Sequence, residues 1–493
     1  MKFKTWKSVA SISLSAGLLH FIDKEKSQSY IVEQLSQLPG LPAKAGQLFA
    51  LKLGIDQQGG PKPIPLDQFL ISLRKESPEL FEHLDRVNEF ANVASLGQVH
   101  EVTLKGQKGA FAVKLGFEGS TETVQEQVQA LMTLFFKWGP GNKFGLSEKD
   151  YVEIYKEAFT EETDYLVEQM SQSSFFEFWR EDPSIQIPEV FPEWCTKRVL
   201  VQRFIEGAKW NSLVNEDKDT KKKFIDSLFY FTLKSLFQIQ KLHTDLQPEN
   251  LAWSKELKRT VIFDFGSVLT FSEEQVLALL KLVDSLRRNA NPNDVKEHLV
   301  IFGFDRLKLS LFQGNLAKAF RMILAPFVFA GPWDFKNQLW GEAISEALGE
   351  QKWWLRSACP PWFLLFMRPF MQMARYAQEF EVSLDLSSLI GELSSIQMAE
   401  PISDFSFKET HLTSHYQLHV QVLKSDKEVV RLSMPVQALQ ELECLIPEET
   451  QHRLQGKGIS TRDIKERALA KGLVPQEVFH QKIEDKEYRI WVE

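Results

Sequence analysis

The stretch L-H-T-D-L-Q-P-E-N at residues 242–250 decides how this chain of 493 residues is interpreted. The run F-D-F-G-S follows it at 263–267, at a distance that fits a short hairpin between two loops. The run A-F-A-V-K, which ends at Lys114, precedes both and has the apolar, β-branched character of a strand. Each fragment is short, so the order and spacing of the three carry the information.

Together the three fragments are typical of a phosphotransfer site of the protein-kinase type. In such a site a strand lysine, here Lys114, holds the α- and β-phosphates of ATP, and a catalytic-loop aspartate, here Asp245, orients the acceptor. Asn250 and the D-F-G aspartate, Asp264, offer hard oxygen ligands that suit Mg²⁺. We therefore predict a site for ATP and Mg²⁺ in which Lys114 and Asp245 are catalytic and Asn250 and Asp264 are metal ligands. We interpret His243 as a structural brace.

The composition is that of an ordinary globular protein, with 43% hydrophobic and 25% charged residues. The net charge of −8 argues against a nucleic-acid-binding surface. The three cysteines lie far apart without the spacing of a disulfide framework or a zinc site, which fits a reducing cytosol. We interpret the stretch at 8–22 as an amphipathic helix, and no run reaches the roughly 18 apolar residues that a membrane span needs. We expect a cytoplasmic protein, with a lipid or membrane surface as a candidate partner.

Hydrophobic patterns divide the chain into four parts. They are a helical extension at 1–65, a first lobe with a helical insertion at 66–206, a second lobe at 207–400 and a small module at 401–493. Strands are expected at 94–102, 109–115 and 199–205, a long apolar helix at 224–242, and a helix that begins at Ser272. The expected fold class is α+β: a protein-kinase-like two-lobed fold with an N-terminal helical extension, a helical tail on the second lobe and a C-terminal α+β module. A protein partner is a candidate for that module.

Two features of ordinary protein kinases are absent from the sequence. No G-x-G-x-x-G precedes Lys114, and the nucleotide-covering loop is instead expected at Ala91–His100. No segment ending in A-P-E follows Gly266, and Thr244 stands where many kinases carry an arginine that reads such a segment. Since peptide substrates rest on that segment, its absence argues against peptide phosphorylation.

The carboxylate that directs Lys114 has two candidate positions. The spacing of ordinary kinases points near Glu126, whereas the run E-E-T-D-Y-L-V-E-Q at 161–169 offers several acidic residues. In that run, helical spacing predicts Asp164 and Glu168 on one helix face. Residue patterns alone leave this choice open.

Several motifs in this order resemble the UbiB/AarF family of atypical kinase-like proteins, which includes mitochondrial ATPases that support coenzyme Q synthesis. They are K-x-G-Q at Lys44–Gln47, A-S-x-G-Q-V-H at Ala94–His100, E-x-D at Glu162–Asp164, and the following Glu168. The resemblance covers about residues 30–390. It implies that Lys44 lies over the nucleotide pocket and meets Glu162, that Lys114 pairs with Glu168, and that Ala94 and Ser95 belong to the loop that contacts the nucleotide.

The function that this resemblance implies is Mg²⁺-dependent ATP hydrolysis linked to lipid or isoprenoid (quinone-type) metabolism. The alternatives are a kinase for a small molecule or a protein, and a nucleotide-binding scaffold with negligible turnover. The chain departs from the family pattern at Asn92 and Val93, which replace two alanines, and at Leu246, Gln247 and Glu249 in the catalytic loop. The resemblance is therefore to a divergent member.

Overall fold

The computed structural model describes residues 63–93, 97–116, 164–288, 291–310, 316–336, 357–403, 417–424, 427–435, 460–471, 475–483 and 486–493, with isolated positions between them. By their internal contacts these residues form two compact units. The first holds the described residues up to Thr270 together with Leu364–Val382, and the second holds those of Phe271–Phe363 and Ser383–Glu493.

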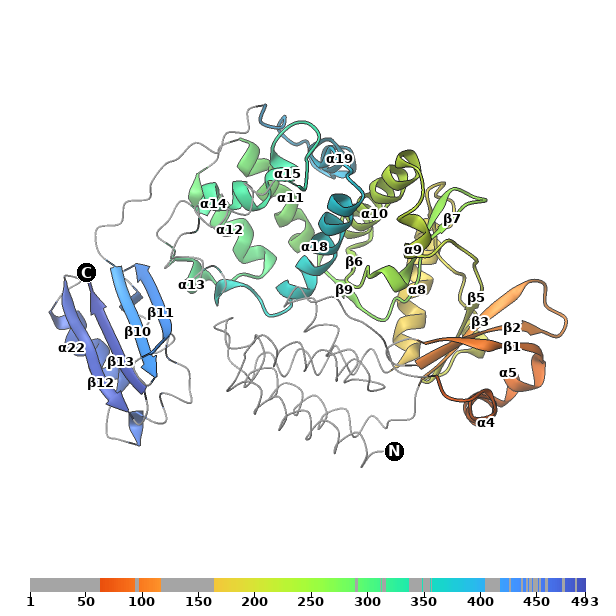
Figure 1. The fold of residues 1–493 in the computed structure, drawn as a ribbon. Coiled ribbons are helices and arrows are strands. Elements are labelled where there is room, and N and C mark those ends of the chain that lie inside the picture. The colour runs from red at the N-terminus through yellow and green to blue at the C-terminus, as the bar shows by residue number, and fades with distance from the viewer. Residues whose placement is uncertain are drawn as a thin grey trace. The chain divides into compact units, whose positions relative to one another are not determined.

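The first unit begins with a four-stranded antiparallel sheet in the order β1-β2-β3-β5 (Figure 1). Its strands are β1 (Leu84–Val93), β2 (Gly97–Leu104), β3 (Ala110–Gly116) and β5 (Val199–Arg203). Side chains alternate between the two faces of a strand. Phe111, Val113 and Leu115 of β3 therefore point to one face, and Lys114 points to the other.

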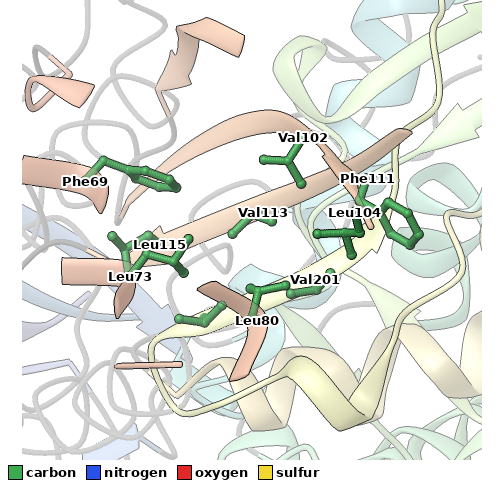
Figure 2. Packing of buried hydrophobic residues seen from close by; sticks show 10 residues of the cluster. Phe69, Leu73, Leu80, Val102, Leu104, Phe111, Val113, Leu115 and Val201 are labelled. Atoms are coloured by element: carbon green, nitrogen blue, oxygen red, sulfur yellow. The ribbon is translucent and has the colours of Figure 1, made fainter. Parts of the chain in front are cut away.

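Helices α4 (Leu66–Glu76) and α5 (Pro78–His83) bury the first of these faces. Figure 2 shows Phe69 and Leu73, one helical turn apart on α4, packed with Leu80 of α5 against the β-sheet side chains. Burying each such side chain stabilises the fold by about 1.5–3 kcal/mol. This layer therefore holds α4 and α5 against the face of the sheet that lies opposite Lys114. On the other face, Tyr165 of α8 (Tyr165–Trp179) packs with Val190 and Leu200.

The rest of the first unit surrounds α10 (Lys218–Ile239), a largely buried helix. The loop that carries Asp245 lies between β6 (Lys241–His243), which pairs with β9 (Val268–Thr270), and β7 (Leu251–Ser254), which pairs with β8 (Arg259–Ile262). The hydroxyl of Tyr376, from α18 (Phe363–Glu379), donates to the carbonyl of Leu246 in this loop. The first unit also contains β4 (Ile185–Gln186), η2 (Pro192–Trp194), α9 (Trp210–Leu213) and η3 (Pro248–Asn250).

The second unit contains a helical group and a separate sheet. The helices are α11 (Glu273–Arg287), α12 (Pro292–Phe302), α13 (Arg306–Ser310), α14 (Leu316–Ile323), α15 (Ala325–Val328) and α19 (Leu386–Leu393). Ser272 begins α11 with a capping box, which satisfies two backbone donors. The sheet has the order β11-β10-β13-β12, from β10 (Gln417–Lys424), β11 (Lys427–Pro435), β12 (Gln476–Ile483) and β13 (Lys486–Val492), with α22 (Thr461–Ala470) beside it in the sequence. No helix among the described residues is long and apolar enough to cross a membrane.

Several expected elements differ from the observed ones. The long apolar helix is α10, which starts six residues earlier than expected, at Lys218, and ends at Ile239, because Leu242 belongs to β6. The expected strand at 94–102 is β2, which starts at Gly97. Strand β1 and helices α4 and α5 were not anticipated, since their segment lacks strict alternation and carries many charges.

Candidate functional site

Lys114 lies at the centre of a buried cluster of charges in the first unit. Its Nζ donates to both carboxylate oxygens of Glu168, at 2.8 and 2.9 Å, and to Oδ2 of Asp264 at 3.2 Å. Lys114 and Glu168 are only 6% and 3% exposed. The structure therefore pairs Lys114 with Glu168, as the family resemblance implies, while the alternative Glu126 lies outside the described residues.

The charge of Lys114 is stabilised by these neighbours. Burial by itself lowers the pKa of Lys114, but the charges of Asp264 and Glu168 outweigh burial and raise this pKa well above its ordinary value. The side chain is therefore held as an ammonium ion, the form that can bind a phosphate.

Helix α8 presents Glu168 from its first turn. Asp164 is the N-cap, and its side chain accepts a hydrogen bond from the backbone N–H of Leu166 at 3.0 Å. The expectation that Asp164 and Glu168 share a helix face was wrong, because Asp164 precedes the first helical residue. Its Oδ2 lies 3.9 Å from Nζ of the exposed Lys197. Capping is the better use of an aspartate at this position, since it satisfies an orphan backbone donor.

Asp264 is held in an unusual backbone conformation with φ of 56°. Such left-handed conformations cost energy in non-glycine residues and persist where the surroundings enforce them. Here the next residue, Phe265, is buried between Phe175 of α8 and His243, with ring centroids 4.9 Å apart in both pairs. The backbone N–H of Gly266 donates to Asp264 Oδ1 at 3.3 Å.

His243 connects the loop that carries Asp245 to the D-F-G run. Its Nε2 donates to the carbonyl of Phe263 at 3.2 Å, and its Nδ1 accepts from the backbone N–H of Asp245 at 3.2 Å. This pattern requires a neutral ring, and burial lowers the pKa of His243 accordingly. The geometry is that of a brace between two loops.

Asp245 and Arg368 form a buried ion pair that the sequence analysis missed. Arg368 Nη2 donates to Asp245 Oδ1 at 2.5 Å, and the two side chains are 4% and 2% exposed. Arg368 comes from α18, more than a hundred residues later in the chain. The sequence did contain a signal for this pair, because Arg368 lies within the apolar run at 362–373. An arginine that is buried with such a run needs an acidic partner.

Asn250 and Asp264 lie on adjoining segments. The backbone N–H of Phe263 donates to the carbonyl of Asn250 at 2.9 Å, and Asn250 Nδ2 donates to the carbonyl of Asp245 at 3.0 Å. Among the described residues no group of three or more histidine, cysteine or acidic side chains could hold a metal by itself. One amide and one carboxylate fit the way Mg²⁺ is bound beside phosphates, where water and phosphate oxygens complete the shell.

The sequence-predicted residues Lys44, Ala94, Ser95 and Glu162 lie outside the described residues. Gln98 follows the loop of Ala94 and Ser95, and its side chain is fully buried. It forms two hydrogen bonds with the backbone of Ile64. Gln98 Oε1 accepts from the N–H of Ile64 at 2.8 Å, and Nε2 donates to its carbonyl at 3.3 Å. His100 Nε2 lies 3.0 Å from the same amide nitrogen and accepts from it. These two motif residues therefore anchor the chain just before α4.

Comparison with known proteins points to the same part of the chain. A family model described as the ABC1 atypical kinase-like domain matches residues 68–299, which include Lys114, Glu168, Asp245, Asn250 and Asp264. Over these residues, a little less than half of its length, the chain is similar to the ABC1 domain, and the matched atypical kinases support a distant relation to the UbiB/AarF family. Arg368 lies beyond the matched segment.

The relatives that match this chain are distant. The rat protein named atypical kinase COQ8B, mitochondrial, is 24% identical over 242 residues, which cover 49% of this chain and 46% of that protein. The yeast protein named atypical kinase COQ8, mitochondrial, is 24% identical over 298 residues, covering 57% and 56%. The matches thus span about half the length of these relatives.

A solved structure supports the fold. The structure of the Rv3197–erythromycin complex from Mycobacterium tuberculosis aligns with a TM-score of 0.52 at 17% identity, and the alignment covers 78% of this chain and 99% of that one. The α+β kinase-like fold expected from the sequence is thereby confirmed.

Proposed function

We propose that this protein binds ATP with Mg²⁺ and hydrolyses it, in connection with lipid or isoprenoid metabolism of the quinone type. The observation that carries the proposal is the buried contact of Lys114 with Glu168 and Asp264. Maintaining a charged lysine in a buried place is costly unless its charge is used or matched, and ATP phosphates are the ligands that such a lysine binds in kinase-like folds.

Each residue then has a distinct task. Lys114 holds the α- and β-phosphates and Glu168 directs it, while Asp264 and Asn250 would hold Mg²⁺. Asp245 orients the attacking water. When bound, Mg²⁺ neutralises charge on the phosphate oxygens. Ala94 and Ser95 contact the nucleotide, and Lys44 with Glu162 covers the cleft; these four residues enter from the resemblance alone.

Water is a better acceptor than a peptide for this site. From Gly266 the chain runs through β9, which pairs with β6, directly to the Ser272 cap of α11. This short connection leaves out the long segment on which protein kinases rest a peptide. A small molecule or lipid remains an alternative acceptor.

The Asp245–Arg368 contact favours a second candidate, a nucleotide-binding scaffold with negligible turnover. With Arg368 bound to Oδ1, part of the carboxylate is occupied by a protein cation. A scaffold of this kind needs nucleotide binding but no proton transfer.

Phosphate release by the purified full chain separates these functions. The protein is incubated with ATP and Mg²⁺, with vesicles of zwitterionic lipid, with vesicles of anionic lipid, and without vesicles. Hydrolysis predicts phosphate release that is lost in Asp245→Asn and rises with one of the vesicle types. Nucleotide binding without release favours the scaffold, and transfer of labelled phosphate to lipid favours the kinase. Absence of Mg²⁺-dependent nucleotide binding would refute the proposal.

A further inference from the structure

Two glycines face each other where β2 and β3 meet. Gly97 begins β2 and pairs with Gly116, the last residue of β3. A Cβ atom at Gly97 would lie 2.6 Å from the hydroxyl oxygen of Tyr165, and closer still to the carbonyl oxygen of Leu115. A Cβ atom at Gly116 would lie 3.6 Å from a ring carbon of Tyr165, an ordinary contact. The Tyr165 side chain therefore occupies space that the absence of a side chain at Gly97 leaves open.

Tyr165 is the first residue of α8 and is 2% exposed. Its backbone N–H donates to the carbonyl of Lys197 at 3.0 Å, just before β5. The Lys114 ammonium lies 4.9 Å from the centre of its ring, a favourable cation–π distance. Its hydroxyl has no hydrogen-bond partner among the described residues, and the neighbours of the side chain include the Lys114 ammonium and the glycine pair.

One helical turn separates Tyr165 from Glu168, the carboxylate that binds Lys114. A shift of the first turn of α8 would therefore move Glu168 away from Lys114. The Tyr165 side chain lies over the glycine pair, with its hydroxyl oxygen near Gly97 and its ring near Gly116, and the same ring faces the Lys114 ammonium. The side chain therefore fixes this turn against the strand that carries Lys114.

We propose that Tyr165 is a positioning residue for the nucleotide site. Seated on the Gly97–Gly116 pair, it holds α8 so that Glu168 and Lys114 are already joined before nucleotide binds. This arrangement needs no activation segment to bring the helix in. The inference rests on the proposed function for its catalytic consequence, but the seating of α8 can be measured separately.

The kinetic test compares Tyr165→Leu, Tyr165→Phe and the control Met170→Ala, an exposed position on the same helix. In the full chain, Tyr165→Leu should lower kcat/KM for ATP about tenfold, chiefly through KM, and Tyr165→Phe should recover most of it. When Glu168 is already replaced by Gln, Tyr165→Leu should lower kcat/KM further by less than about twofold. The reason is that a residue that acts through Glu168 has no further effect once Glu168 is replaced. Equal losses in both backgrounds, or none in either, would overturn the proposal.

Hydrogen exchange of the segment 164–170 tests the seating without relying on turnover. Exchange should quicken in Tyr165→Leu, and more in Gly97→Ala than in Gly116→Ala, since only the first places a methyl group inside contact distance of Tyr165. The added methyl group at Gly97 also lies close to the carbonyl oxygen of Leu115. Gly97→Ala is therefore repeated together with Tyr165→Phe, which removes the hydroxyl oxygen and should return exchange of 164–170 part of the way to its wild-type rate. Equal exchange in the two glycine variants refutes the seating even if ATP hydrolysis is observed. Faster exchange in Gly97→Ala in a protein that binds no ATP keeps the seating and refutes the proposed function.

Discussion

At the scale of single residues, the site is assembled from charges that are buried against opposite charges. Lys114 is bound to Glu168 and Asp264, and Asp245 is bound to Arg368. Breaking such a pair leaves one buried charge without compensation, which costs more than the pair contributes when intact. Substitutions here are therefore expected to affect both stability and the proposed nucleotide binding, so each must be measured separately.

Asp264→Asn should abolish the Mg²⁺-dependent stabilisation of the protein by ATP. Asp264 is the proposed bridging ligand for the metal, and an amide is a weaker ligand for Mg²⁺ than a carboxylate. Wild-type protein at a nucleotide concentration near 100 Kd should gain about 2.7 kcal/mol, read as a rise in Tm. Thermal melts with and without ATP, Mg²⁺ and chelator check this. An undiminished shift in the variant would remove Asp264 from the site.

Arg368→Leu should destabilise the first unit by about 3–5 kcal/mol, because it leaves the buried Asp245 carboxylate without its cation. Urea unfolding measures the change. Met371→Ala, an exposed position on the same helix, is the control and should change stability little. Adding Asp245→Leu to Arg368→Leu should restore part of the loss. A cost of less than about 1 kcal/mol for Arg368→Leu would contradict a buried pair.

The buried His243 should make stability depend on pH. Its pKa in the folded state is lowered from 6.5, so below about pH 6.5 the unfolded chain binds more protons than the folded one. The free energy of unfolding should therefore be unaffected by His243 at higher pH and fall as pH drops through 6.5 toward the folded pKa. His243→Gln should show a shallower decline of Tm with falling pH, though not a flat one, since the pKa of His298 is also lowered. Identical slopes would contradict this assignment.

At the scale of elements, the sheet and α8 determine which residues meet. Alternation along β3 sends Phe111, Val113 and Leu115 into the packed layer of Figure 2. It leaves Lys114 on the opposite face, where Lys114 contacts Glu168 of α8. The N-cap at Asp164 then sets where α8 begins, and hence where Glu168 stands. Strand alternation thus determines the position of Lys114, and helix capping determines that of Glu168.

The same rules show how much the sequence could predict. Strand alternation predicted β3, motif spacing predicted the loops of Asp245 and Asp264, and the apolar run predicted the existence of α10 but not its bounds. They could not supply Arg368, because its contact with Asp245 depends on how α18 packs and not on any local pattern. They also missed β1, whose pairing with β2 contains irregularities that hide its alternation.

Gln98→Ala should loosen the entry of the chain into α4. The substitution removes both partners of the Ile64 backbone, and unsatisfied buried groups cost about 1–3 kcal/mol. Hydrogen exchange of the Ile64 amide should quicken, with a lower Tm. The control is Gln107→Ala in the exposed turn between β2 and β3. An Ile64 amide that stays equally protected in both variants would show that Gln98 does not anchor this segment.

At the scale of the whole molecule, the part that carries the candidate site is assembled from distant stretches of chain. Residues 97–116, 164–270 and 364–382 all belong to the first unit. The four-part division expected from the sequence, with boundaries after 65, 206 and 400, stays a prediction. So do the membrane surface and the protein partner of the C-terminal module.

Lys44→Ala should change ATP affinity or turnover while the Tm without nucleotide stays near that of wild type. The family resemblance places Lys44 over the cleft with Glu162, where it excludes other acceptors, and a lysine on a helix surface contributes little to stability. Nucleotide binding and phosphate transfer, including autophosphorylation, are compared for Lys44→Ala, Glu162→Ala and the control Lys75→Ala, an exposed lysine of α4. If both motif variants match wild type in every assay, the K-x-G-Q segment has only a packing role.

The strand order of the C-terminal sheet has a consequence for folding. β10 pairs with its neighbour in sequence, β11, on one side but with the distant β13 on the other. The two hairpins β10–β11 and β12–β13 close locally and quickly, whereas joining them requires a long loop to close, which is slower. Until that step the inner edges of β10 and β13 expose unpaired backbone groups that can pair with another chain. In this module, newly made protein is therefore exposed to pairing with other chains until the two hairpins join.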